Sequence, residues 1–246
     1  MKTPRQYDDP DIGSVILNQR RHLKHVRITV KPDLQVQVSF PYRVSATQAI
    51  RYVQEKKGWI VKTLRKFREE QDERFLFTPA MEYHTHFHKI LIKTHGEEQL
   101  TFHIGEDATT IRVPDNRDPR DPFIQDWIRH AVEETWRVEA KRYLPSRVAS
   151  LAAQHHFQFR KVAIRNAKTR WGSCSDTNNI NLSLHLMRLP YDLIDFVILH
   201  ELCHTIHKHH GWEFHALLDR LCNGEEKRMN ARLRRVNMKD YRMVTD

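Results

Sequence analysis

The sequence predicts an α+β protein in which a β-rich N-terminal domain precedes a second domain built mainly of helices. Before residue 114, apolar and polar residues alternate in several short runs, which is the period of half-buried strands. Residues 114–122 are dense in Asp, Arg and Pro, a composition typical of a linker. After this segment, apolar residues recur at helical spacing. We therefore expect two domains, formed by residues 1–118 and 119–246.

The N-terminal domain is expected to contain a β-hairpin, one long helix and further strands. The alternation of apolar residues from Val26 to Phe40 is interrupted at residues 31–33, which indicates two strands joined by a turn. Ser45 is placed to cap a helix that continues to about Glu70, with apolar residues along one side. Further strands are predicted near residues 83–94, 99–104 and 109–113.

The second domain is expected to begin with a helix that Pro145 interrupts, because proline lacks the amide hydrogen that a helix interior needs. Another helical segment should cover residues 146–156. Strands should follow within residues 160–187, around a turn at 176–179, because apolar and polar residues alternate after that turn. Helices near residues 192–207, 212–222 and 224–236 complete the predicted order.

The helix expected over residues 192–207 contains the most informative motif of the chain. Its residues are apolar nearly all round, which predicts a helix buried in a core. It includes the string His200-Glu201-Leu202-Cys203-His204, which places both histidines on one face, one turn apart. Asp192 is placed to cap this helix, and Gly211 lies beyond its end. A chain turn near Gly211 would bring His210 back toward the two histidines.

A metal site explains these residues better than coincidence does. The chain has 17 histidines, so a pair at this spacing could arise without a function. However, a buried glutamate and buried histidines without partners would each cost about 1 to 3 kcal/mol. We predict that His200, His204 and His210 bind Zn²⁺ and leave one position open for water. Glu201 would then take a proton from that water as the general base of a hydrolase.

A second candidate segment is Arg170-Trp171-Gly172-Ser173-Cys174-Ser175, where a glycine between an aromatic and small polar residues allows a close backbone approach. The following strand, residues 180–186, is expected at a sheet edge above the metal, where an extended peptide could pair with it. The alternative is an ordinary turn beside a core tryptophan. The residues predicted to contact a protein or peptide substrate are Arg170, Trp171, Gly172, Ser173 and Asn181.

Composition indicates a cytoplasmic protein without a membrane partner. The N-terminus has no apolar run typical of a signal peptide, and no segment approaches the roughly 20 apolar residues of a membrane span. The three cysteines include no CxxC pair, which argues against a disulfide framework or a cysteine zinc ribbon. Cys203 lies off the face of the two helix histidines and is expected to pack as a small apolar residue.

The positive charge leaves other partners and activities open. A net charge of +10 favours anionic partners, such as nucleic acid or nucleotides. The basic residues are dispersed along the chain, so nucleic acid is possible but not favoured. Two alternatives to a peptidase remain: a metal-dependent phosphohydrolase acting on nucleotides, and a DNA-associated protease that docks through the basic surface.

The RWGSCS segment, a strand ending in Leu-Pro, the HELCH string and a third histidine followed by Phe214 together resemble the YgjP-like metallopeptidase domain of bacteria. The chain is more distantly similar to SprT-like and WLM zinc proteases. The resemblance implies a zincin-like fold and a hydrolase, with His200, His204 and His210 as zinc ligands and Glu201 as general base. The chain departs from the family pattern after the third histidine, where residues 211–215 are Gly-Trp-Glu-Phe-His.

Overall fold

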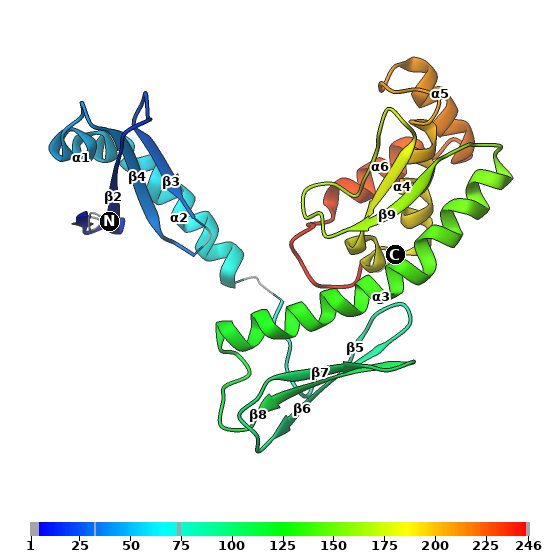
Figure 1. Ribbon diagram of the computed structural model, residues 1–246, viewed down its shortest axis with the longest axis horizontal. Coiled ribbons are helices and arrows are strands. Elements are labelled where there is room, and N and C mark those ends of the chain that lie inside the picture. Colours follow the sequence, from blue (N-terminus) through cyan, green and yellow to red (C-terminus); the bar gives the residue numbers. More distant parts are fainter. Residues whose placement is uncertain (1–4, 32, 73–74, 245–246) are drawn as a thin grey trace. The chain divides into compact units, whose positions relative to one another are not determined.

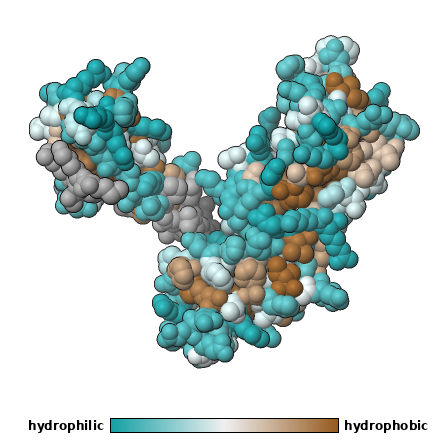
Figure 2. Space-filling model, viewed as in Figure 1, coloured by the Kyte–Doolittle hydropathy of each residue, from teal (hydrophilic) through white to brown (hydrophobic). Residues whose placement is uncertain are grey.

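The computed structural model describes residues 5–31, 33–72 and 75–244, and divides into two compact units, Met1–Arg74 and Phe75–Asp246. Both units contain strands and helices in separate runs, which confirms the predicted α+β class (Figure 1). Figure 2 shows hydrophilic side chains over much of the visible surface of each unit. Among the helices of the described residues, none combines the length and the apolar character that a membrane span requires. Each unit is described by itself below.

The first unit is a four-stranded sheet with the order β1-β2-β4-β3, packed against two helices. The predicted hairpin over residues 26–40 is confirmed as the antiparallel pair β3–β4, although Pro32 lies outside the described residues. Strands β1 and β2 were not predicted from the sequence. The elements are β1 (Arg5–Asp9), β2 (Gly13–Arg20), β3 (Arg27–Val30), β4 (Val36–Pro41), α1 (Ala46–Glu55) and α2 (Lys57–Asp72).

The single long helix predicted after Ser45 is two helices, so that prediction was only partly right. Ser45 caps α1 as expected, because its Oγ accepts from the amide of Gln48 while the Gln48 side chain accepts from the amide of Ser45. The helix ends at Glu55, and the φ of −100° and ψ of 7° of its C-cap residue, Lys56, depart from helical values. Gly58 follows in the first turn of α2, and glycine weakens a continuous helix.

The second unit begins with a sheet of order β5-β6-β8-β7 that shares its core with α3 (Pro122–Gln154). Its strands are β5 (Tyr83–His84), β6 (Lys89–His95), β7 (Thr101–Ile104) and β8 (Ala108–Pro114). Apolar residues of β6 and β8, including Ile92 and Ile111, are buried in one cluster with Ile128 of α3. The division between compact units therefore falls before Phe75, and not at the boundary predicted after residue 118.

The helix α3 continues through Pro145, so the predicted interruption is wrong. Asp121 caps the helix by accepting a hydrogen bond of 2.8 Å from the amide of Phe123. Leu144 and Val148, on either side of the proline, are buried in the same core. We attribute the continuity to this packing, which outweighs the local cost of proline.

The site-bearing part of the second unit is a three-stranded sheet of order β10-β11-β9, followed by helices (Figure 1). The elements are β9 (Lys161–Arg165), β10 (Gly172–Cys174), β11 (Asn179–Ser183), the 3₁₀ helix η1 (Leu184–Arg188), α4 (Tyr191–Cys203), α5 (Trp212–Leu221) and α6 (Glu226–Arg235). The strand predicted at the sheet edge, near residues 180–186, is β11 and lies in the centre. The edge beside α4 is β10, which among the described strands pairs with β11 alone.

The helix α4 is buried as predicted, but its first turn differs from the prediction. The N-cap residue is Pro190, which makes no side-chain cap, and Asp192 lies inside the first turn. The Asp192 carboxylate accepts from the amide of Leu193 at 2.8 Å, so it still serves the start of the helix. Cys203 ends the helix and is fully buried, in agreement with its predicted packing role.

Candidate metal centre

Three histidine side chains converge where α4 ends. His200 and His204 lie one turn apart with ring centroids 4.9 Å from each other. His210, in the segment between α4 and α5, turns back so that its Nε2 lies 3.1 Å from Nε2 of His200 and 3.1 Å from Nε2 of His204. Ligand atoms of all three lie within 4.8 Å of one another. The structure thus brings together the three histidines that the sequence singled out.

The protonation of these imidazoles suits a metal. His204 Nδ1 lies 2.9 Å from the backbone oxygen of His207, and because an oxygen there only accepts, Nδ1 carries the proton and Nε2 keeps a lone pair. Burial lowers the pKa of His200 to about 4, assisted by the charges of the neighbouring histidines. Two zinc-bound imidazole nitrogens in tetrahedral geometry stand about 3.3 Å apart, close to the spacing seen here. The residues present fit a divalent, borderline-soft cation.

Phe214 forms an apolar floor beneath the three imidazoles. It is fully buried in the first turns of α5, and its ring centroid lies 4.9, 4.6 and 4.7 Å from those of His200, His204 and His210. Because one side chain contacts all three rings, it limits their rotation. The sequence alone assigned no such role to Phe214, which lies in α5, four residues after His210.

Glu201 stands beside the histidines in an apolar setting. Its side chain is buried, and Oε2 has no hydrogen-bond partner within the described part of the chain. Burial raises the pKa of Glu201 to about 8, although the nearby charge of Arg170 opposes the shift. A buried, unpartnered carboxylate oxygen is costly for stability, and such groups are found where chemistry needs them.

Gly172 of β10 makes room for this carboxylate. A Cβ atom built at Gly172 would lie 2.6 Å from Oε1 of Glu201 and 2.8 Å from its Cδ, closer than real contacts allow. A larger residue at this position would therefore displace the carboxylate. The sequence indicated that another group could approach the backbone closely at Gly172. In the structure, that group is the side chain of Glu201.

The backbone of β10 is available at its outer edge. Trp171 accepts from the amide of Ser183 at 2.8 Å, and the amide of Ser175 donates to Asn179 at 2.9 Å. In an antiparallel pair these bonds recur at every second residue, so Gly172 and Cys174 direct their amides and carbonyls away from β11. The free edge of the sheet therefore lies next to Glu201, which is a suitable place for an extended peptide to pair.

Comparison with protein families agrees with this geometry. The model of the YgjP-like metallopeptidase domain matches residues 24–235 of the chain. The chain belongs to the YgjP-like metallopeptidase family. No curated protein and no solved structure matches it. The matched span includes the three histidines, Glu201 and the edge strand, and it also takes in most of the first compact unit.

In this YgjP-like chain, the residues predicted to contact substrate differ in their surroundings. Gly172 and Ser173 lie on the edge strand, and Asn181 of β11 donates to Oγ of Ser173 at 3.4 Å. Arg170 is exposed where the chain enters β10. Trp171 is partly buried and packs against the core, with the guanidinium of Arg188 lying 5.9 Å from its ring centroid.

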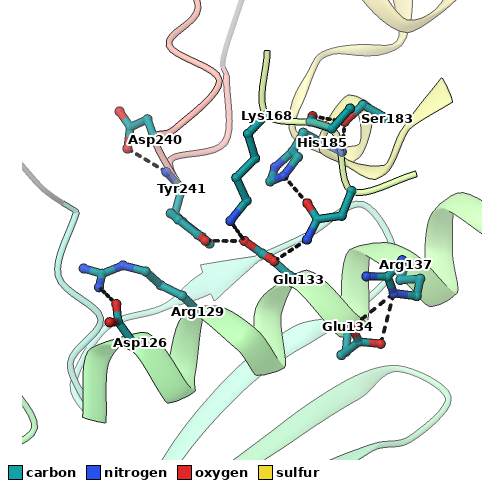
Figure 3. Close-up of polar contacts among 12 residues, drawn as sticks. Asp126, Arg129, Glu133, Glu134, Arg137, Lys168, Ser183, His185, Asp240 and Tyr241 are labelled. Atoms are coloured by element: carbon teal, nitrogen blue, oxygen red, sulfur yellow. Dashed lines mark hydrogen bonds and ion pairs between the residues drawn. The ribbon is translucent and has the colours of Figure 1, made fainter. Parts of the chain in front are cut away.

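A polar network around the buried Glu133 supports the loop that leads into β10 of the YgjP-like domain (Figure 3). Glu133 of α3 accepts from Lys168 at 2.5 Å, from Asn166 at 2.8 Å and from the hydroxyl of Tyr241. His185 Nε2 bonds to the side-chain oxygen of Asn166 at 2.9 Å. Burial raises the pKa of Glu133, but these hydrogen bonds and the charge of Lys168 outweigh it and lower the pKa overall. Sequence analysis missed this network because its members come from four separate segments.

Proposed function

We propose that this chain is a zinc-dependent peptidase in which His200, His204 and His210 hold the metal and Glu201 is the general base. One observation supports the proposal above the others: three imidazole nitrogens converge beside the buried Glu201, which lies against the edge strand of a sheet and whose Oε2 has no hydrogen-bond partner among the described residues. Each part has a use in peptide hydrolysis, and the family to which the chain belongs is a metallopeptidase family.

The roles of the residues follow from their positions. Zinc, when bound, supplies Lewis-acid polarisation of the peptide carbonyl and of the attacking water. Oε2 of Glu201, which makes no other hydrogen bond within the described residues, accepts a proton from the attacking water and passes it to the leaving amine. The hydrogen bond from His204 Nδ1 to the carbonyl of His207 fixes the orientation of that imidazole.

The substrate would bind as an additional strand. The outward amides and carbonyls of Gly172 and Cys174 can pair with an extended peptide, and this pairing holds the backbone of the peptide beside Glu201. Because backbone pairing is independent of side chains, it suits the unfolded segments of many proteins. Selectivity then has to come from side-chain contacts around the edge.

The test is Glu201→Gln, which keeps the shape of the side chain and removes the base. We expect normal zinc content by elemental analysis, and cleavage of unfolded casein reduced by roughly a hundredfold or more. Glu213→Gln is the matched control, because Glu213 is an exposed carboxylate on the neighbouring helix. Unchanged cleavage by zinc-loaded Glu201→Gln protein would contradict the proposal. Chelator-sensitive hydrolysis of nucleotides with no peptide cleavage would favour a phosphohydrolase.

A further inference from the structure

A groove of about 420 Å³ lies alongside the candidate active site, and the proposed reaction does not use it. Its lining includes Arg165 of β9, Arg170, Gly172, Ser173 and Asn181. Gly172 belongs to both places, because it lines the groove and also touches Glu201. A molecule held at the edge strand is therefore next to the groove.

The groove is positively charged and its charge is not neutralised. Within the described residues, neither Arg165 nor Arg170 forms an ion pair, and no carboxylate lines the groove. Arg165 makes one long hydrogen bond, in which Nε donates to the side-chain oxygen of Asn181 at 3.4 Å. Both guanidinium groups thus retain donors for a ligand.

The neighbouring Lys168 differs from the two arginines, because its charge is neutralised by an ion pair. Lys168 lies between the two arginines in sequence, but its ammonium group is bound to the buried Glu133 at 2.5 Å. Tyr241 and Asn166 also donate to this carboxylate, so its acceptors are taken up by the network (Figure 3). Of these three neighbouring cations, Lys168 is therefore neutralised by Glu133, whereas Arg165 and Arg170 remain at the groove.

The register of the sheet connects the groove to a bound peptide. Ser173 and Asn181 are opposite one another and share a face, whereas Ile180 and Leu182 face the core. A peptide that adds a strand to the edge at β10 continues this alternation, so every second side chain emerges on the face of Ser173. A long side chain on that face lies beside the groove.

We propose that this groove is a specificity subsite that binds the carboxylate of an Asp or Glu side chain in the peptide, with Arg165 and Arg170 as the ligands. The inference rests on the proposed peptidase function. Guanidinium groups bind carboxylates through paired hydrogen bonds, and Asn181 and Ser173 add neutral polar groups. Peptides with an acidic residue close to the cleaved bond are therefore the preferred substrates.

The test measures binding, so that its outcome is separate from that of the proposed reaction. Full-length Glu201→Gln protein loaded with zinc is titrated with labelled, amidated Ala-Ser peptides that differ only in a central Glu or Gln. We expect the Glu peptide to bind roughly two- to fivefold more tightly, the scale of exposed ion pairs. Adding Arg165→Gln and Arg170→Gln should equalise the two affinities. Circular dichroism verifies that this variant is folded.

Arg160→Gln is the matched control, because Arg160 is exposed near the start of β9 and does not line the groove. It should keep the preference for Glu. Equal binding of the two peptides before any arginine is changed would overturn the proposal, as would an equal loss of preference in Arg160→Gln. Tighter binding of a Gln peptide with a free C-terminal carboxylate would assign the groove to chain termini, and strong competition by ADP would assign it to phosphates. Either result would also overturn the proposal.

Discussion

At the scale of single residues, the site depends on a contact between segments that are distant in sequence. The glycine of the RWGSCS segment is recognisable as a point of close approach from its neighbours alone. The group that approaches, Glu201, could not be identified, because that requires the packing of β10 against α4. The three histidines were easier to identify, since two share one helix face and the third follows within a few residues.

We predict that Gly172→Ala impairs catalysis without removing the metal. The new methyl group would lie 2.6 Å from Oε1 of Glu201, so the carboxylate has to move. Cleavage of unfolded casein should fall by at least about tenfold, because a misplaced base transfers protons poorly. Gly96→Ala is the control, since a Cβ there meets only a side-chain oxygen of Asp115 at 4.0 Å. Full activity of Gly172→Ala would show that the position of Glu201 is unimportant.

We predict that His210→Ala abolishes stoichiometric zinc binding, whereas His209→Ala does not. His210 contributes the nitrogen that lies 3.1 Å from both other imidazole nitrogens, and His209 is an exposed neighbour outside this cluster. Elemental analysis of both purified variants should give about one zinc per chain for His209→Ala and little for His210→Ala. The reverse result would move the third ligand to His209.

At the scale of elements, local signals were reliable where local chemistry decides the structure. The capping box at Ser45, the β3–β4 hairpin and the apolar helix α4 all follow from short sequence patterns. The errors arose where tertiary packing decides. Core contacts on both sides of Pro145 keep α3 continuous, and the order of strands in a sheet is not encoded in any one strand.

The network around Glu133 gives a prediction about how these elements are held together. Tyr241→Phe keeps the ring that stacks on Trp136 but removes the hydroxyl that donates to Glu133. The free energy of unfolding of the second unit should fall by about 1 to 3 kcal/mol, the range for a lost hydrogen bond to a charged, buried group. Urea denaturation followed by tryptophan fluorescence measures the change.

Tyr191→Phe is the matched control for this variant. Tyr191 is exposed and its hydroxyl makes no hydrogen bond within the described residues, so its removal should change stability little. If both variants lose the same stability, the effect belongs to tyrosine hydroxyl groups in general. An unchanged free energy of unfolding in Tyr241→Phe would mean that Lys168 and Asn166 satisfy Glu133 without it.

At the scale of the whole molecule, the residues that match the family model do not coincide with either compact unit. The family match begins at residue 24, within the first unit, so it contains β3, β4 and both helices of that unit, whereas β1 and β2 precede it. Each unit nevertheless has a hydrophobic core of its own. The linker-like composition of residues 114–122 suggested a boundary there, but composition does not reveal that β6 and β8 bury their apolar faces with α3.

Truncation tests this division. A fragment of residues 75–246 retains its entire core and all three histidines, so we expect a folded protein with cooperative unfolding and about one chelator-sensitive zinc per chain. A fragment of residues 119–246 lacks β5 to β8 and would expose Ile124, Ile128 and other core residues of α3 to water. It should aggregate or fail to unfold cooperatively, because lost burial costs about 25 cal/mol per Å² of apolar surface. A soluble, cooperatively folded 119–246 fragment with bound zinc would restore the boundary near residue 118.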